Sequence, residues 1–148
     1  MANTSNRAAT AAALTSLLTT QFDYKAVSVS DGPPAVLDRE HVWVGDITTD
    51  TLGLSDFGDA MGDDQHLDRF TVHVLHWAGN PGQSGGEARA RAEELAVVGI
   101  DEIIRQRLLT GVLTAYIGGA DGPDVEPSDD EGFVGMFTRY VKIEQPII

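Results

Sequence analysis

Residues 68–109 read DRFTVHVLHWAGNPGQSGGEARARAEELAVVGIDEIIRQRLL and predict a strand, a turn and a helix in succession. Apolar and polar residues alternate over residues 69–77, which is typical of a β-strand because successive side chains point to opposite faces. A glycine-rich turn follows, and Ser84 precedes Glu87 by three residues, the spacing of a helix N-terminal capping box. We therefore expect a β-turn-α unit around which the rest of the chain can be placed.

The helix of this unit should pack on a sheet through one side. Small and apolar residues recur after Glu87 at the spacing of a single helical face. Glu87 with Arg91, and Asp101 with Arg105, are four residues apart and predict ion pairs along the other side.

The rest of the chain supplies one more helix and four more strands. A run without glycine or proline from Arg7 to Gln21 has apolar residues three or four apart and predicts an N-terminal helix. We expect strands at residues 24–29, 40–47, 112–117 and 133–143, which are rich in β-branched and aromatic residues. This order predicts one α+β domain over residues 1–148, with a mainly antiparallel sheet and two helices packed on it.

Two long polar segments interrupt this pattern. Residues 48–67 contain three glycines and five aspartates, and structureless segments of that length are often binding or assembly elements, so we predict an extended hairpin arm. Residues 118–132 contain six acidic residues and predict an acidic loop between the last two strands.

The composition limits the classes of function. A formal net charge of −13 disfavours a surface for the nucleic-acid backbone, because such binding needs clustered lysine and arginine. The same negative charge is compatible with an acidic surface along which DNA passes without binding. The absence of cysteine excludes disulfides, thiolate metal ligands and a cysteine nucleophile. No apolar run approaches the roughly 20 residues that cross a bilayer. The N-terminal region lacks the charged start and continuous apolar centre of a secretory signal, so we expect it to belong to the mature protein.

The sequence offers little sign of a metal site. His73 and His76 are three residues apart on one predicted strand, which sends them to opposite faces and disfavours a shared zinc ion. Neither acidic segment has the ligand spacing of a calcium-binding loop.

The turn from Gly79 to Gly86 leaves one alternative open. A glycine-rich turn between a strand and a helix is the usual setting of a phosphate-binding loop. This turn lacks the Gly-Lys-Ser/Thr ending, and no lysine occurs between Lys25 and Lys142. A small domain that binds a phosphate ligand is therefore the weaker hypothesis.

The order of the elements carries a family resemblance. The relevant features are the strand His41-Val42-Trp43-Val44-Gly45-Asp46, the long polar arm, the strand of residues 70–77, the glycine-rich turn and the helix of residues 87–107. In this order they resemble the tail terminator, or tail completion, proteins of long-tailed bacteriophages, also described as minor tail or head-to-tail joining proteins. The resemblance extends over nearly the whole chain, from the N-terminal helix to Val141.

The resemblance implies a structural virion protein and not an enzyme. Family members are small α+β subunits that form a ring, usually a hexamer, at the head-proximal end of the tail tube. The ring stops tube growth and presents a surface to the head connector, and the genome passes through its lumen without specific binding. The implied partners are further copies of the chain, the tail tube protein and a head-tail connector protein, with assembly in the host cytoplasm. The family pattern brings no catalytic, metal or cofactor residues and no membrane. Another connector component, a stopper or an adaptor, is the nearest alternative.

We expect such rings to assemble through the sheet edges and the arm of residues 48–67. The candidate interface residues are Trp43, Asp56, Asp59, Asp63, Asp64 and Trp77.

Overall fold

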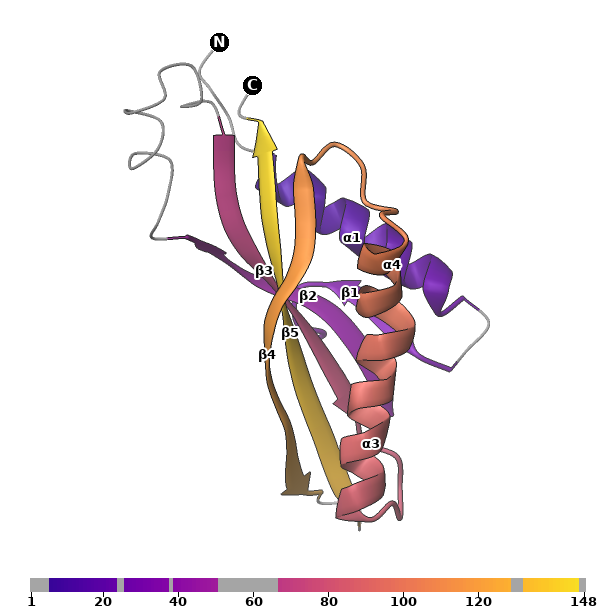
Figure 1. The fold of residues 1–148 in the computed structure, drawn as a ribbon. Helices are drawn as coiled ribbons and strands as arrows, with labels where there is room; N and C mark the ends of the chain where they lie inside the picture. Colours follow the sequence, from indigo (N-terminus) through magenta and orange to yellow (C-terminus); the bar gives the residue numbers. More distant parts are fainter. Residues whose placement is uncertain (1–5, 24–25, 38, 51–66, 129–131, 147–148) are drawn as a thin grey trace.

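The computed structural model describes residues 6–23, 26–37, 39–50, 67–128 and 132–146 (Figure 1). Within them the chain forms a five-stranded sheet in the order β1-β2-β3-β5-β4, with helices packed on it. This arrangement confirms the predicted α+β class. The elements are α1 (Arg7–Gln21), β1 (Ser28–Asp31), β2 (Glu40–Thr49), β3 (Leu67–Ala78), α3 (Gly85–Ala96), the π-helical turn η2 (Val97–Asp101), α4 (Glu102–Arg105), β4 (Thr114–Pro127) and β5 (Phe133–Pro146).

The sheet is mainly antiparallel, as predicted. β3 lies in the centre and runs antiparallel to both β2 and β5, and β4 pairs with β5 in a long twisted hairpin (Figure 1). β1 pairs in parallel with β2 and forms the other edge. Among the described elements, helices cover only one face of the sheet.

The core lies between that face and the helices. Phe70, Val72 and Val74 of β3 are fully buried and share one apolar cluster with Leu14 and Leu18 of α1. The residues of β3 that alternate with them point to the opposite face and are mostly half-buried. The alternation over residues 69–77 therefore matches the two faces of β3, and the structure shows that Phe70, Val72 and Val74 lie on the core side.

Two glycines allow the helices to approach their neighbours closely. A Cβ added at Gly135 of β5 would lie 2.0 Å from the carbonyl oxygen of Ala88, so α3 rests directly on that strand. A Cβ at Gly99 would lie 2.8 Å from the ring of Phe22, which follows α1. The small side of the second helix thus packs on the sheet as expected.

Bidentate ion pairs attach each helix to a strand. Arg7 of α1 donates to both carboxylate oxygens of Asp68, at 2.8 and 2.7 Å. Arg91 of α3 donates to both oxygens of Glu40, at 2.6 and 2.8 Å. The predicted pair of Arg91 with Glu87 is therefore wrong: Arg91 binds Glu40 of the sheet and, along the helix, Glu94 at 3.0 Å.

The prediction of an acidic loop over residues 118–132 is wrong for residues 118–127, which belong to β4. Two bulges fit this strand to the long, continuous β5. Because β4 is an edge strand, Asp121, Asp124 and Glu126 remain exposed to water while they are in extended backbone. Residues 129–131 lie outside the described part of the chain.

Of the hairpin arm predicted over residues 48–67, the structure describes only the two ends, residues 48–50 and residue 67. β2 continues through Thr49 and β3 begins at Leu67. Residues 51–66 lie outside the described residues, so the arm stays a prediction. In the part of the chain that the structure describes, no helix combines the length and the apolar character needed to cross a membrane.

Candidate assembly surfaces

The helix-free face of the sheet carries large apolar side chains. Trp43 of β2 is opposite Leu75 of β3, and Trp77 of β3 is opposite Met136 of β5. Tyr140 of β5 continues the row, where its ring meets that of His73 edge-on at 4.8 Å. All of these side chains are half-buried. The two tryptophans predicted as interface residues therefore share one face and stand on neighbouring strands.

Two further glycines let these side chains lie along the sheet. A Cβ added at Gly45 would be 2.6 Å from Leu75 Cδ1, and one added at Gly79 would be 2.9 Å from Trp77 Nε1. Larger residues at either position would lift the neighbouring side chain. The large side chains of this face therefore lie against the sheet, where each is half-buried.

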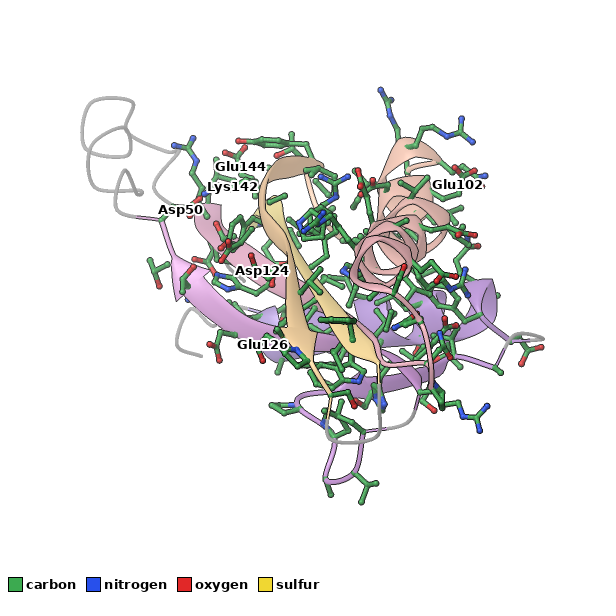
Figure 2. All side chains as sticks on the ribbon, turned by 90° about the horizontal axis from the view of Figure 1, so that it is seen from below. Asp50, Glu102, Asp124, Glu126, Lys142 and Glu144 are labelled. Carbon is green, nitrogen blue, oxygen red and sulfur yellow. The ribbon has the colours of Figure 1, made fainter. Side chains whose placement is uncertain are left out.

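A polar cluster closes one end of the same face (Figure 2). Lys142 Nζ lies 3.3 Å from Asp50 Oδ1, and Thr71 Oγ1 donates to that oxygen at 2.8 Å. A Cβ at Gly118 would lie 2.3 Å from Lys142 Cγ. The absence of a side chain at Gly118 therefore leaves room for the lysine side chain to cross β4. Asp50 is the last described residue at the N-terminal end of the arm predicted over residues 48–67, and these contacts fasten it to the sheet.

The outer edge of β4 is divided into two different halves. Asp121, Asp124 and Glu126 are exposed, and within the described residues none of them has an ion-pair partner, whereas Glu144 of β5 is bound by Arg69 at 2.6 Å. Charges and bulges on an edge strand discourage another strand from pairing with it. This half of β4 is therefore protected against strand addition.

The other half of the edge borders an apolar groove with a volume of about 500 Å³. Leu113 and Tyr116 are 56% and 57% exposed beside it. Arg107, which follows α4 with a φ of 55°, is the charged residue in its wall. The lining consists of Ile103, Ile104, Arg107, Leu109, Val112, Leu113, Thr114, Ala115 and Tyr116, and we call it the β4 groove. The apolar residues on either side of Gly111 are visible in the sequence, but their pattern predicts only the strand of residues 112–117.

The remaining predicted interface residues are not placed. Asp56, Asp59, Asp63 and Asp64 lie outside the described residues, so their prediction stays open.

The turn from Gly79 to Gly86 is occupied by structural contacts. The capping box forms: Glu87 N donates to Ser84 Oγ at 3.1 Å, and Ser84 N donates to the Glu87 carboxylate at 3.0 Å. Asn80 Nδ2 donates to Glu40 at 2.8 Å. Two carboxylates therefore flank the amides that a phosphate would need, which makes the turn a poor anion site.

The same turn also matches the Gly-x-Ser-x-Gly pattern of hydrolase nucleophile elbows over residues 82–86. In those enzymes the serine sits on a strained, sharp turn with its hydroxyl exposed. Ser84 instead has ordinary extended angles (φ −72°, ψ 166°), and its hydroxyl caps α3. The geometry is that of a helix start.

The histidines that the structure describes, His41, His73 and His76, do not converge, and His66 lies outside the described residues. His73 lies on the helix-free face and His76 is buried in the core, which confirms that the two point to opposite faces. His41 Nε2 lies 3.0 Å from Ser30 Oγ. Among the described residues no group of three or more histidine, aspartate or glutamate side chains is arranged to hold a metal ion.

His76 of β3 belongs to a polar cluster with Arg139 of β5 and Asp101 of η2, in which His76 is fully buried and the other two are partly exposed. Its Nδ1 donates to the carbonyl oxygen of Phe137 at 2.9 Å, and burial lowers the pKa of His76 to about 4. Arg139 Nη2 donates to Asp101 at 2.8 Å, so Asp101 is bound by the sheet and not by Arg105 as its spacing predicted. The cluster ties the helical layer to β3 and β5.

Comparison with known proteins adds no relationship: no protein-family profile matches the chain, and no curated protein matches it.

Proposed function

We propose that this chain is a structural virion subunit that forms a ring at the head-proximal end of a phage tail tube, where it ends tube growth and joins the tail to the head connector. The proposal rests on the resemblance of the element order to tail terminators. The structural observation that supports it is that, among the described elements, helices cover one face of the sheet and leave the other without a helix. Its other face presents Trp43 and Trp77, and one edge opens into the β4 groove.

These features suit a subunit that completes its surfaces by contact with others. An uncovered apolar face and a free sheet edge are stable in water only at a cost, and oligomer contacts remove both. The polar cluster around Asp50 supports the same function, because it fixes the root of the predicted arm against the sheet. The partners are further copies of the chain, the tail tube and the head connector, and the exposed carboxylates of β4 suit a ring through which DNA moves without binding.

The test is the deletion of the gene from its phage, followed by electron microscopy of the lysate. Loss of a terminator gives overlong tails that carry no heads, and the gene supplied in trans restores tails of normal length. Free tails of normal length together with leaking heads would instead assign the chain to a head-side stopper or adaptor. Normal virions after deletion would overturn both.

A further inference from the structure

The cluster of His76, Arg139 and Asp101 contains three buried polar atoms that have no hydrogen-bond partner among the described residues. These atoms are His76 Nε2, Arg139 Nε and Asp101 Oδ1, and each of them is out of contact with solvent. Buried polar atoms in folded proteins are normally paired, either with protein groups or with ordered water. Three unpaired atoms in one cluster therefore point to a bound molecule between β3, β5 and η2.

Contacts that the structure shows hold the three side chains close together. His76 and Phe137 are directly opposite each other on β3 and β5, and the centres of their rings are 6.2 Å apart. The guanidinium carbon of Arg139 lies 4.8 Å from the centre of the same Phe137 ring. Arg139 Nη2 also donates to Asp101 Oδ2 at 2.8 Å. The guanidinium group is thus a neighbour of both the imidazole and the carboxylate.

The protonation of His76 decides what its unpaired nitrogen can do. Burial is the main cause that lowers the pKa of His76 to about 4, and the positive charge of Arg139 contributes to the lowering. The imidazole is therefore neutral at pH 7. Its proton is on Nδ1, because Nδ1 donates to the carbonyl oxygen of Phe137 and a carbonyl oxygen can only accept. Nε2 is left as an acceptor.

The three unpaired atoms together offer one donor and two acceptors. Arg139 Nε carries a hydrogen, whereas His76 Nε2 and Asp101 Oδ1 each present a lone pair. A molecule that accepts one hydrogen bond and donates two would satisfy all of them. Water is the smallest molecule with this capacity, and buried waters typically make about three hydrogen bonds to such groups.

Ions suit the same position poorly. A metal cation would lie beside the Arg139 guanidinium, which repels it and has no lone pair with which to bind it. An anion could accept from Arg139 Nε but would face the Asp101 carboxylate and the lone pair of His76 Nε2. The cluster therefore selects a neutral molecule that both donates and accepts.

We propose that one internal water molecule is bound in this cluster, where it accepts a hydrogen bond from Arg139 Nε and donates to His76 Nε2 and Asp101 Oδ1. The site does not depend on the proposed ring function. The water joins β3, β5 and η2, so it extends the ion pair of Arg139 with Asp101 into a network that holds the helical layer on the sheet. Its donation to Nε2 also favours the neutral imidazole, in agreement with the low pKa of His76.

The first test uses the purified, unchanged protein. A high-resolution crystal structure should show a peak of electron density at hydrogen-bonding distance, about 2.7–3.2 Å, from all three atoms. Empty density at this position, with the three side chains in direct contact with one another, would overturn the proposal. So would an anomalous signal that identifies the occupant as chloride or a metal ion.

Nitrogen NMR of the imidazole at pH 7 tests the direction of the hydrogen bonds. The spectrum should show His76 protonated on Nδ1, with Nε2 bare and accepting. A proton on Nε2 would contradict the proposal, because His76 and Arg139 would then both donate to the bound molecule.

His76→Phe tests whether the water depends on Nε2. The variant keeps an aromatic ring but replaces the acceptor with a C–H group that points at the water, so the water should be lost. Magnetic relaxation dispersion of water oxygen detects long-lived internal waters in solution, and its signal should be smaller in the variant than in the unchanged protein. An equal signal, with the density still present, would show that His76 does not bind the water.

Val74→Ala is the matched control. Val74 is fully buried and directly opposite Arg139 on β3, so the change loosens packing beside the cluster without removing a hydrogen-bonding atom. The apolar space that it leaves stays dry, and the water signal should equal that of the unchanged protein. Equal losses in both variants would mean that packing and not hydrogen bonding retains the water, which would overturn the proposal. Circular dichroism establishes that both variants are folded, and the crystal structure of the unchanged protein decides the question if His76→Phe is not.

Discussion

At the scale of single residues, His76 makes the stability of the fold depend on pH. Burial holds its pKa at about 4, against 6.5 for the free side chain. Between these values the unfolded chain binds a proton that the folded chain does not, so stability falls as the pH is lowered from about 6.5 to about 4. Above this window both states are neutral at His76 and the residue contributes no pH dependence.

We therefore predict that His76→Gln flattens the pH dependence of unfolding. The histidine should account for a loss on the order of 3 kcal/mol across the window, at roughly 1.4 kcal/mol per unit of pKa. Urea denaturation of both proteins at several pH values from 4 to 7 measures the difference in slope. Parallel curves would show that His76 is solvated and that its proton uptake does not differ between the two states.

Residues such as Arg91 and Asp101 mark a limit of sequence reasoning. Their spacing to Glu87 and Arg105 suggested pairs along one helix, yet each binds a residue of the sheet. A partly buried ion pair between helix and sheet is stronger than an exposed pair along a helix. The spacing of residues in the sequence can indicate pairs within one helix, but it holds no information about a partner on a distant strand.

At the scale of elements, the contact between α3 and β5 depends on the absence of a side chain at Gly135. We predict that Gly135→Ala destabilises the fold by about 2–3 kcal/mol, because the added carbon would lie 2.0 Å from the backbone of Ala88 and push the helix outward. Thermal unfolding measures the effect.

Gly86→Ala is the control for this change. It adds the same methyl group in the first turn of α3, where nothing lies within 4 Å, and alanine is the better helix former. This variant should be as stable as the unchanged protein or more so. If Gly135→Ala were equally harmless, α3 would not rest on β5 as described.

The capping box shows which elements are readable from local sequence. Ser84 and Glu87 predicted the start of α3 because both of its hydrogen bonds lie within four residues. β4 was missed beyond Ile117 because its extended backbone is imposed by pairing with β5, against the turn-forming preference of Gly118, Gly119 and Gly122.

At the scale of the whole molecule, tryptophan fluorescence should report assembly. The chain contains two tryptophans, and both lie half-buried on the helix-free face. We predict that acrylamide quenches their emission in the monomer and quenches it less, with a shift to shorter wavelength, when that face is covered in the ring.

The two positions can be separated by Trp43→Phe and Trp77→Phe, each of which leaves a single reporter. Protein diluted until sedimentation velocity shows only monomers is the unassembled reference. Equal quenching in assembled and unassembled protein would mean that the helix-free face stays in contact with water and takes no part in subunit contacts.

By itself the sequence determined the α+β class, the strand of residues 69–77 with its two alternating faces, and the capped second helix. These depend on alternation, helical spacing and turn chemistry, which act between residues close together in the chain. Only the tertiary structure decided that β4 replaces most of the acidic loop, that Arg91 and Asp101 bind the sheet, and that the β4 groove forms between α4 and β4. Each of these joins segments far apart in sequence, so it follows from the packing of the whole chain and from no local pattern. The unit of residues 68–109 supplies part of the groove wall through Ile103 and Ile104, but the surface exists only because β4 passes beside it.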